Sequence, residues 1–262
     1  TSNIYSPSWD SVGHNETLLA EAFALYTGQA NISDVIVATK GGITRGEGET
    51  WSRDGSAAGL KAACEGSMTA LGATVIDVYQ LHRHDPRETY ADQIRAISDL
   101  RDLGWVQEVG ISNATLAELE VALEILGGPG EGGLVSVQNE FSPRFREDRE
   151  VLERCTELGI AFLPWSPLGG SDNAKTLGSQ FGEFAVVAAE HAASVQEVTL
   201  AWLLSLSPTM IPIPGATKPV TIDSIVRSMR IELSDSQRVR LSATESVGET
   251  IFPESEPRSP LR

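Results

Sequence analysis

The strongest constraint on the fold of this chain is a repeated alternation of short apolar runs with longer helical patterns. Six runs are rich in branched apolar residues, and each is followed by a polar loop and a helix-forming stretch. In chain order they are DVIVATK, TVIDVYQLH, WVQEVGIS, GLVSVQNEF, GIAFLPWSPL and TMIPIPGA. Apolar strands that alternate with helices indicate a parallel sheet covered by helices. The repeat, roughly 30 residues long, fits a (β/α)8 barrel or a doubly wound sheet.

Two of the intervening segments show where their helices should lie. Leu60, Cys64 and Met68 recur at helical spacing, so we expect them to share one face of the helix after the first run. The next helix should begin near Pro86 and end near Gly104, because glycine is suited to a helix C-cap. Helices therefore separate successive strands, as a parallel sheet requires.

Composition limits the partners of the chain. It has 262 residues and a formal net charge of −16, so it lacks the basic surface that attracts nucleic acids and anionic membranes. No apolar run approaches the roughly 18 residues of a membrane span. Cys64 and Cys155 fall in helical patterns and are expected to be buried, reduced thiols of a cytoplasmic protein. We expect one domain over residues 1–246 and a polar tail over 247–262, and the oligomeric state stays open.

The six runs are fewer than the about eight strands of a closed barrel, and the shortfall lies at the front of the chain. The start, TSNIY, is typical of the end of a strand with nothing before it. We therefore expect residues 1–4 to complete a second strand, which makes the chain an N-terminally incomplete barrel of about six strands. At the usual pace of a barrel, about 45 further residues would precede Thr1.

Three residues with chemical potential fall at the ends of strands, where the chemistry of parallel α/β folds collects. They are Tyr5, Lys40 and His82. Taken singly, a lysine at a strand end is usually a surface group and a histidine there is usually structural. Together, an ammonium and an imidazole can polarise the phenol, and the ammonium would lower the pKa of Tyr5. The three residues are therefore candidates for a proton-donating group.

The motifs as a set resemble those of the aldo-keto reductase superfamily, from Thr1 to about Leu241. In order they are TSNIYSPSWDSVGHNETLLAEAF, VIVATKGG, IDVYQLHRHDP, VGISNA, VQNEFSP, LPWSPLGG, LAWLLS and IPIPGATK. The resemblance implies a (β/α)8 barrel that reduces an aldehyde or ketone, a small-molecule carbonyl substrate. It also implies NADPH as the cofactor, with NADH as the alternative, bound without the Rossmann motif G-x-G-x-x-G. No such motif follows a strand here.

The resemblance assigns roles to the residues at the strand ends. Tyr5 matches the proton donor, Lys40 the lysine that lowers its pKa, and His82 the histidine that orients the carbonyl. The superfamily also has an aspartate in a D-T-A-x-x-Y pattern, and this chain begins at the threonine of that pattern. The resemblance therefore implies an aspartate directly before Thr1.

The remaining matches concern the cofactor. Ser112, Asn113 and Gln138 would bind the carboxamide, and Trp165 would stack on the nicotinamide. The positions expected along the phosphates and the adenosine are Ser166, Leu168, Gly215, Thr217 and Lys218. Of these, Ser166 and Leu168 would follow the pyrophosphate, and Lys218 would meet the 2′-phosphate. Ile225 departs from the pattern, because related chains often have an asparagine there near the adenine, and this departure weakens the expectation of NADPH over NADH.

Two other functional classes fit part of the sequence. The segment LHRH has the His-x-His spacing of metal-dependent barrel hydrolases, but later strand ends lack further His or Asp, so no metal is expected. The second class is a non-catalytic relative that binds a nucleotide and acts as a regulatory subunit. The absence of the catalytic aspartate from the given residues would favour it, whereas the presence of Tyr5, Lys40 and His82 favours an enzyme. His14, His84 and His191 are interpreted as solvated or structural. Trp51, in the loop GGITRGEGETWSRDG, either contacts substrate or packs its loop down.

Overall fold

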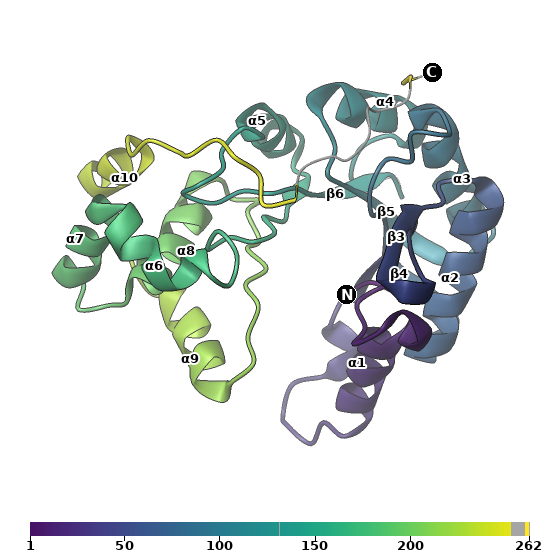
Figure 1. Cartoon of the computed structure of the whole chain (residues 1–262), viewed down its shortest axis with the longest axis horizontal. Coiled ribbons are helices and arrows are strands. Elements are labelled where there is room, and N and C mark those ends of the chain that lie inside the picture. Colours follow the sequence, from purple (N-terminus) through teal and green to yellow (C-terminus); the bar gives the residue numbers. More distant parts are fainter. Residues whose placement is uncertain (131, 253–259, 262) are drawn as a thin grey trace. The chain divides into compact units, whose positions relative to one another are not determined.

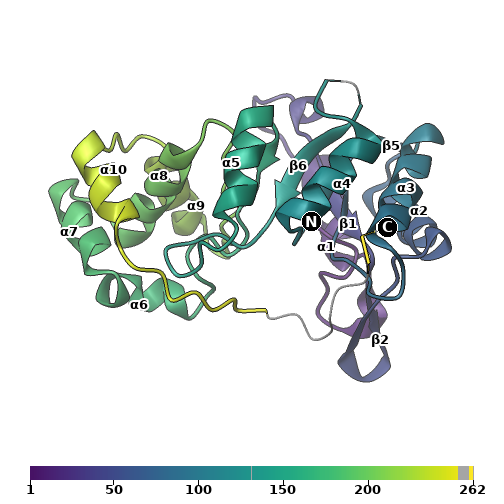
Figure 2. The same ribbon diagram turned by 90° about the horizontal axis from the view of Figure 1, so that it is seen from above.

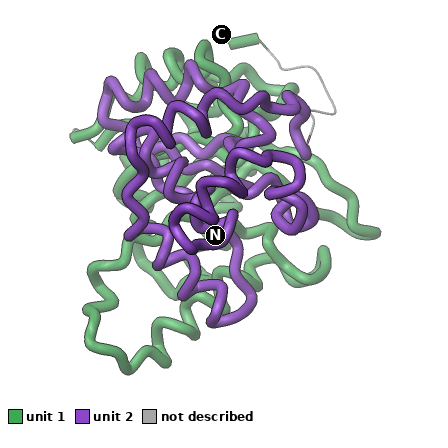
Figure 3. Tube along the Cα trace, turned by 90° about the vertical axis from the view of Figure 1, so that its left-hand side faces the viewer, with its two compact units in different colours: residues 1–136, 255–262 green, residues 137–254 purple. Residues whose placement is uncertain are grey.

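The computed structural model describes residues 1–130, 132–252, 260 and 261. The chain divides into two compact units, which Figure 3 shows in green and purple. Unit 1 begins at Thr1 and ends at Ser136, and it includes the described residues 260 and 261. Unit 2 begins at Val137 and holds the rest of the described chain. The expected catalytic residues therefore lie in unit 1, and most of the expected cofactor residues lie in unit 2.

Unit 1 contains the parallel strands that the apolar runs predict. They are β1 (Ala38–Gly41), β4 (Ile76–Leu81) and β5 (Val106–Ser112), and β6 (Leu134–Gln138) is next in the sheet order, with its first three residues in unit 1 and its last two in unit 2. The pairs β1·β4 and β4·β5 are parallel, and Lys40 of β1 lies opposite Gln80 of β4. Five of the six residues of β4 are buried, because helices cover the strand. The register places Lys40 and His82 near one another at the same end of the sheet.

Four α-helices accompany these strands. They are α1 (His14–Ala24), α2 (Ala57–Leu71), α3 (Tyr90–Asp102) and α4 (Leu116–Leu126), and Figures 1 and 2 show α2, α3 and α4 side by side in chain order. Ser56, Thr89 and Thr115 each accept a hydrogen bond from a backbone N–H in the first turn, so the helices start at capped ends. Short 3₁₀ turns lie at Trp9–Ser11, Ile32–Asp34 and Glu47–Glu49.

The loop after β1 contains a hairpin that the sequence did not predict. Strands β2 (Ile43–Gly46) and β3 (Thr50–Arg53) pair antiparallel, with Arg45 opposite Trp51. The guanidinium carbon of Arg45 lies 5.1 Å from the centre of the Trp51 ring, which is a cation–π geometry. The sequence did not predict this hairpin, because the glycines of the segment are typical of an irregular loop.

Unit 2 is mainly helical. Strand β7 (Ala161–Phe162) follows β6 in the sheet order, and the helices are α5 (Arg149–Leu158), α6 (Asn173–Gln180), α7 (Gly182–Glu190), α8 (Val195–Leu206), α9 (Pro219–Ser228) and α10 (Asp235–Ser242). Trp202 of α8 is fully buried and packs edge-on against Phe184, with ring centres 5.4 Å apart. The Arg146 guanidinium covers the same indole at 4.7 Å. These aromatic contacts form part of the core of the unit.

Besides the hairpin, the observed elements differ from the expected ones at three places. Residues 1–4 form no strand, although they run beside β1, where the Thr1 nitrogen donates to the Ala38 carbonyl at 2.8 Å. The helix expected near Pro86 begins at Tyr90, because Asp85 binds the backbone N–H groups of Gly55 and Arg87 and holds the intervening residues in a turn.

The third difference concerns the sixth apolar run, which forms a single bridge instead of a strand. That bridge pairs Met210 with Phe162 in a parallel arrangement. Pro212 and Pro214 follow directly, and proline has no N–H to donate to a strand ladder. Among the described residues, the main sheet therefore has five strands, to which the sixth run adds a bridge, and this order fits a (β/α)8 barrel.

Both cysteines are free and buried, as predicted. Burial raises the pKa of each thiol to about 12, so neither is a reactive thiolate at neutral pH. Among the described helices, none combines the length and the apolarity needed to cross a membrane.

Because α2 packs closely on the sheet at Gly41, we expect any side chain at this position to lower the stability of the fold. A Cβ there would lie 1.9 Å from the hydroxyl oxygen of the buried Tyr79 and 3.2 Å from the Ala63 Cβ. Gly41→Ala should therefore lower the free energy of unfolding by about 1–3 kcal/mol. The control, Gly66→Ala, adds a Cβ with no atom within 4 Å in α2 and should raise it by up to about 1 kcal/mol. Urea unfolding followed by circular dichroism compares them, and equal effects of the two substitutions would contradict the packing described.

Candidate active site

Tyr5, Lys40 and His82 meet at one end of the unit 1 sheet. Lys40 lies near the end of β1, His82 follows β4, and Tyr5 lies in the segment that runs beside β1. The Lys40 Nζ is 5.2 Å from the centre of the Tyr5 ring. The rings of Tyr5 and His82 are 5.7 Å apart and nearly perpendicular, at 84°. The structure thus brings together the three residues that the sequence analysis grouped.

Lys40 is a buried ammonium. Its side chain belongs to a residue that is only 3% exposed, and Nζ donates a hydrogen bond to the Thr1 carbonyl at 2.6 Å. Burial lowers the pKa of Lys40 to about 8, while the negative charge of Glu16 acts in the opposite direction. At neutral pH, about nine-tenths of a group with such a pKa is charged.

Tyr5 remains protonated in this environment. It is 42% exposed, and its partial burial raises the pKa of the phenol. The sequence analysis expected Lys40 to lower this pKa, but the ammonium lies over the ring face, and within the described residues the hydroxyl forms no hydrogen bond to Lys40 or to His82. A phenol that keeps its proton and faces solvent can donate that proton to a bound oxygen.

His82 is held neutral and has a hydroxyl neighbour that the sequence analysis missed. Burial lowers the pKa of His82 well below its usual value, and the charges of Lys40 and Arg83 lower it further. The Ser2 Oγ lies 3.2 Å from the His82 Nδ1. Ser2 is fully buried and stands where the pattern D-T-A-x-x-Y has an alanine. This serine in place of alanine was the signal in the sequence for the contact with His82.

Ser112 ends β5 and Asn113 follows it, and Asn113 is bonded to the backbone of His82. The Asn113 Nδ2 donates to the His82 carbonyl at 2.9 Å and lies 3.1 Å from the Ser112 Oγ. Asn113 has φ of 57°, a left-handed conformation that asparagine tolerates better than most residues. Two adjacent strand ends of unit 1, those of β4 and β5, are therefore joined by a hydrogen bond between their polar groups.

Within unit 2, Gln138 and Trp165 lie at neighbouring strand ends. Gln138 ends β6 and is buried. The segment with Trp165 pairs with the chain after β6 through a parallel bridge to Glu140. The Phe252 ring lies 5.7 Å from the Trp165 ring, and the Thr250 hydroxyl and the Ile251 N–H donate to the Glu140 carboxylate. The start of the expected tail is therefore attached to the strand ends of unit 2.

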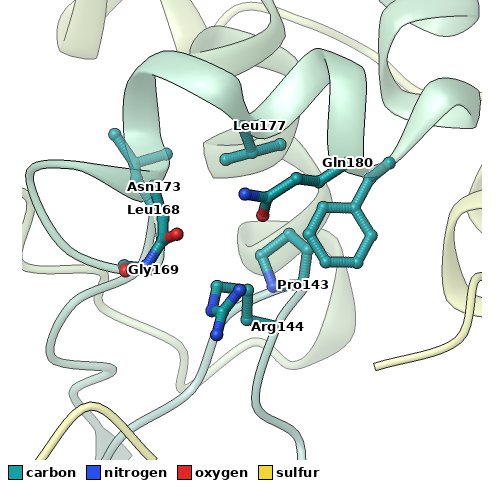
Figure 4. Close-up of a pocket in the computed structure, with 8 residues that line it drawn as sticks. Pro143, Arg144, Leu168, Gly169, Asn173, Leu177 and Gln180 are labelled. Atoms are coloured by element: carbon teal, nitrogen blue, oxygen red, sulfur yellow. Dashed lines mark hydrogen bonds between the residues drawn. The ribbon is translucent and has the colours of Figure 1, made fainter. Parts of the chain in front are cut away.

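The loop after Trp165 contains the positions expected to follow a pyrophosphate. Ser166 has φ of 48°, and its carbonyl accepts from the Gly169 N–H at 2.7 Å, which closes a tight turn. Leu168 and Gly169 line a small pocket that Arg144 also lines, as Figure 4 shows. A Cβ on Gly169 would lie 2.9 Å from the Arg144 Cδ, so the glycine allows the arginine stem to approach the loop.

Arg144 is a cation that the sequence analysis did not single out. Its Nε is buried and has no hydrogen-bond partner among the described residues. It lies beside the loop of Leu168 and Gly169 and in the same pocket as Asn173. The signal in the sequence was weak, because an arginine in a loop is most often a surface group.

The last expected cofactor segment is exposed in unit 2. Gly215, Thr217 and Lys218 are all exposed, and Lys218 is the N-cap of α9. Pro219 occupies the first turn of that helix, whose free N–H groups favour an anion. Ile225 is half-buried within α9.

The other residues discussed from the sequence have ordinary surroundings. His84 is buried and bonded through Nδ1 to the Glu118 carboxylate, so it is structural as expected. His14 is exposed, His191 contacts Gln237, and Trp51 is 59% exposed on its hairpin. In the part of the chain that the structure describes, no three metal-ligating side chains converge.

Comparisons with known proteins give one consistent result. The model of the aldo/keto reductase family matches residues 1–245. The uncharacterized oxidoreductase C215.11c of Schizosaccharomyces pombe is 34% identical over 227 residues, which cover 87% of this chain and 69% of that protein. The pyridoxine 4-dehydrogenase of Escherichia coli is 29% identical over 241 residues, which cover 90% of this chain and 77% of that protein.

Solved structures show the same fold at lower identity. The crystal structure of a putative 2,5-diketo-D-gluconic acid reductase B has a TM-score of 0.76 at 19% identity, over 97% of this chain and 80% of that one. An aldo-keto reductase from a deep-sea metagenome library has a TM-score of 0.74 at 20% identity, over 93% of this chain and 82% of that one. These likenesses, together with the strand order, establish an α/β fold of the (β/α)8 type.

The left-handed backbone at Asn113 generates a prediction on stability. Asn113→Gly and Asn113→Ala both remove the bond to the His82 carbonyl, but only alanine carries a Cβ into the left-handed region. Asn113→Ala should therefore be less stable than Asn113→Gly by about 1 kcal/mol. Thermal and urea unfolding measure the difference. Ala192 has φ of 49°, so it already carries a Cβ in the left-handed region. As a control, Ala192→Gly relieves this strain and should raise the stability of the protein. Equal stability of the two Asn113 variants would show that the loop relaxes.

Proposed function

Because the chain belongs to the aldo/keto reductase family, we propose that it reduces an aldehyde or ketone to an alcohol with NADPH as the hydride donor. The single observation that carries this proposal is the meeting of Tyr5, Lys40 and His82 at one end of a parallel sheet. The chain is an oxidoreductase by its relatives. The choice of reaction within that class, the cofactor and the roles of residues are our inference.

The proposed chemistry follows from the state of each side chain. Tyr5 keeps its proton, because burial raises its pKa, and donates it to the carbonyl oxygen as negative charge develops there. The positive charge of the Lys40 ammonium, which lies over the phenol ring, stabilises that developing negative charge, and the effect is stronger because Lys40 is buried. A neutral His82 offers a ring N–H to the same oxygen and orients the carbonyl. NADPH, when bound, supplies the hydride that the carbonyl carbon receives.

The residues present fit a dinucleotide. Asn113 and Gln138 are amides that match a carboxamide, and Trp165 is an aromatic ring at a strand end that can stack on a nicotinamide. Arg144 has a buried Nε without a partner beside the Leu168–Gly169 turn, and this orphaned donor suits a pyrophosphate. Exposed Thr217 and Lys218 at the start of α9 suit the 2′-phosphate.

The substrate is proposed only by class. A half-exposed Tyr5 and the exposed Trp51 on its hairpin leave the proton donor open to a small molecule. One relative carries the name pyridoxine 4-dehydrogenase, so a panel of small aldehydes that includes pyridoxal is the first choice. Loss of NADPH absorbance on adding each carbonyl tests the proposal. Binding of NADPH without turnover of any carbonyl would favour the alternative, a non-catalytic nucleotide-binding relative.

Removal of the Tyr5 hydroxyl should separate proton donation from binding. Tyr5→Phe keeps the ring that lies under the Lys40 ammonium, so we expect NADPH affinity to change little. Loss of the proton donor should lower kcat by about 10²–10⁴-fold, because only the transition state needs the proton. Steady-state rates and NADPH titration measure the two effects. Wild-type turnover in Tyr5→Phe would show that another group is the acid.

The cation at the start of α9 should distinguish the two cofactors. Lys218→Ala removes a charge-assisted contact to the 2′-phosphate, which is worth about 1.5–3 kcal/mol. NADPH should therefore bind about 10- to 100-fold more weakly, while NADH, which lacks this phosphate, should change little. Lys175→Ala, an exposed lysine in α6, is the matched control. Equal losses for NADPH and NADH would refute the assignment of Lys218.

A further inference from the structure

The hairpin of β2 and β3 has no part in the proposed reaction, although Arg45 joins it to the segment that carries Tyr5. The Arg45 Nη1 donates to the Ser6 carbonyl at 2.6 Å and to the Ser6 Oγ at 3.1 Å, and Ser6 directly follows Tyr5. The backbone of Tyr5 is itself fixed, because its N–H donates to the Ser2 carbonyl and its carbonyl accepts from the Asn15 N–H, each at 3.1 Å. The hairpin is therefore attached to the backbone of the proposed proton donor.

The base of the hairpin is attached to the segment that follows His82. The Arg53 Nη1 donates to the His84 carbonyl at 2.6 Å, and the Gly55 N–H donates to the Asp85 carboxylate at 2.8 Å. Both acceptors belong to the loop after β4 that begins at His82. The hairpin is thus held by the segment of the phenol on one side and by the segment of the imidazole on the other, which places it beside the candidate active site.

Trp51 lies on the same face of the hairpin as Arg45. The two residues are opposite one another in the antiparallel register, and the side chains of directly paired residues share a face. The Arg45 guanidinium carbon lies 5.1 Å from the centre of the indole, which is a cation–π contact. One guanidinium thus contacts both the Ser6 carbonyl and the indole. Trp51 therefore lies next to the segment that carries Tyr5.

The charge of Arg45 is paired within the hairpin. Its Nε donates to the Glu49 Oε2 at 2.6 Å, and its Nη2 forms a salt bridge with the same oxygen. The Glu49 Oε1 accepts from the Trp9 N–H at 3.2 Å. Glu49 has φ of 62°, an uncommon conformation for a residue other than glycine, which persists where the surrounding contacts require it. Because the carboxylate balances its charge, Arg45 is suited to holding the indole and not to attracting an anionic substrate.

Trp51 offers an open aromatic surface. The residue is 59% exposed, although the Arg45 guanidinium lies over its ring. An indole that is fixed in place favours a second flat ring packed against it, because aromatic rings attract one another in offset and edge-to-face arrangements. Tyr5 is also partly exposed, so the proton donor and the indole are both open to a small molecule.

We propose that Arg45 holds the Trp51 indole beside Tyr5, so that the hairpin favours carbonyls carried on a flat ring, such as aromatic and heteroaromatic aldehydes. Trp51 contacts the ring of the substrate, and Arg45 acts through Trp51 as a positioning residue. The preference among substrates rests on the proposed function, because it requires a carbonyl to be reduced. The packing of a flat ring on the indole does not depend on turnover.

Two aldehydes of matched size test the preference. Benzaldehyde has a flat ring, and cyclohexanecarbaldehyde has the same number of carbon atoms in a puckered ring. The ratio of kcat/KM for the two is compared between variant and wild type, which cancels their different intrinsic reactivities. Trp51→Leu should lower this ratio about 3- to 10-fold, whereas Trp51→Phe, which keeps an aromatic ring, should lower it less.

Arg45→Met tests the positioning role, because it removes the guanidinium and keeps an unbranched side chain. It should lower the same ratio by a similar factor, and in Arg45→Met/Trp51→Leu the two effects should not add, since both act through the indole.

Lys61→Met is the matched control. The Lys61 Nζ lies 5.2 Å from the centre of the Trp105 ring, so this pair is another cation–π contact of unit 1. Trp105 directly precedes β5 and lies at the opposite end of that strand from the candidate active site. Loss of this cation should leave the ratio unchanged.

A measurement without turnover separates this proposal from the proposed function. In protein labelled with 5-fluorotryptophan, the five tryptophans give five ¹⁹F signals, and Trp51→Phe identifies the signal of Trp51. Benzyl alcohol, which NADPH cannot reduce, is added in the presence of NADPH and should shift the Trp51 signal more than cyclohexylmethanol does. In Arg45→Met this shift should be lost. Circular dichroism verifies that each variant is folded.

An unchanged ratio in folded, active Trp51→Leu or Arg45→Met would overturn the proposal, as would an equal change in Lys61→Met. If benzyl alcohol shifts the Trp51 signal but the protein reduces no carbonyl, then the proposed function is wrong and the ring-binding surface stands. If carbonyls are reduced and neither the ratio nor the ¹⁹F signal depends on Trp51, then the proposed function stands and this inference is wrong.

Discussion

The burial of one ammonium, that of Lys40, is the constraint on which the rest of the account depends. The lysine is 3% exposed near the end of β1, and its Nζ donates a hydrogen bond to the neutral Thr1 carbonyl. Such a charge is expensive to bury, and a fold retains it when it does chemistry or has a compensating charge nearby. Here the Tyr5 ring lies 5.2 Å from Nζ, which fits the proposed role of Lys40 in proton donation, and the negative charge of Glu16 opposes the effect of burial on the Lys40 pKa.

Sequence patterns predicted the strands and helices wherever local chemistry decides the outcome. Continuous apolar runs gave β4, β5 and β6, and polar caps and glycine set the bounds of α2 and the end of α3. The pattern failed where a tertiary contact or a missing N–H prevailed. Asp85 delays the start of α3, and two prolines after Met210 reduce an expected strand to one bridge. The hairpin of Ile43–Gly46 and Thr50–Arg53 was missed because glycine obscured its alternation.

The site was predicted in part for the same reasons. Residues at the carboxyl ends of parallel strands must gather, so Tyr5, Lys40 and His82 could be grouped from their places in the chain. Ser2, Glu16 and Arg144 could not be, because their burial and their contacts with residues distant in sequence appear only in the folded chain. The direction of the Tyr5 pKa was also beyond the sequence, since it follows from the burial of the phenol in the folded chain.

The central claim is that the protein transfers a hydride from a bound nicotinamide to a carbonyl in a fixed geometry. The most direct measurement uses NADPH that carries deuterium on one or the other face of the nicotinamide C4, with mass spectrometry of the alcohol formed. A single fixed face predicts that the alcohol gains deuterium from one of the two labelled cofactors and none from the other. Deuterium from both cofactors, or from neither, would contradict the account.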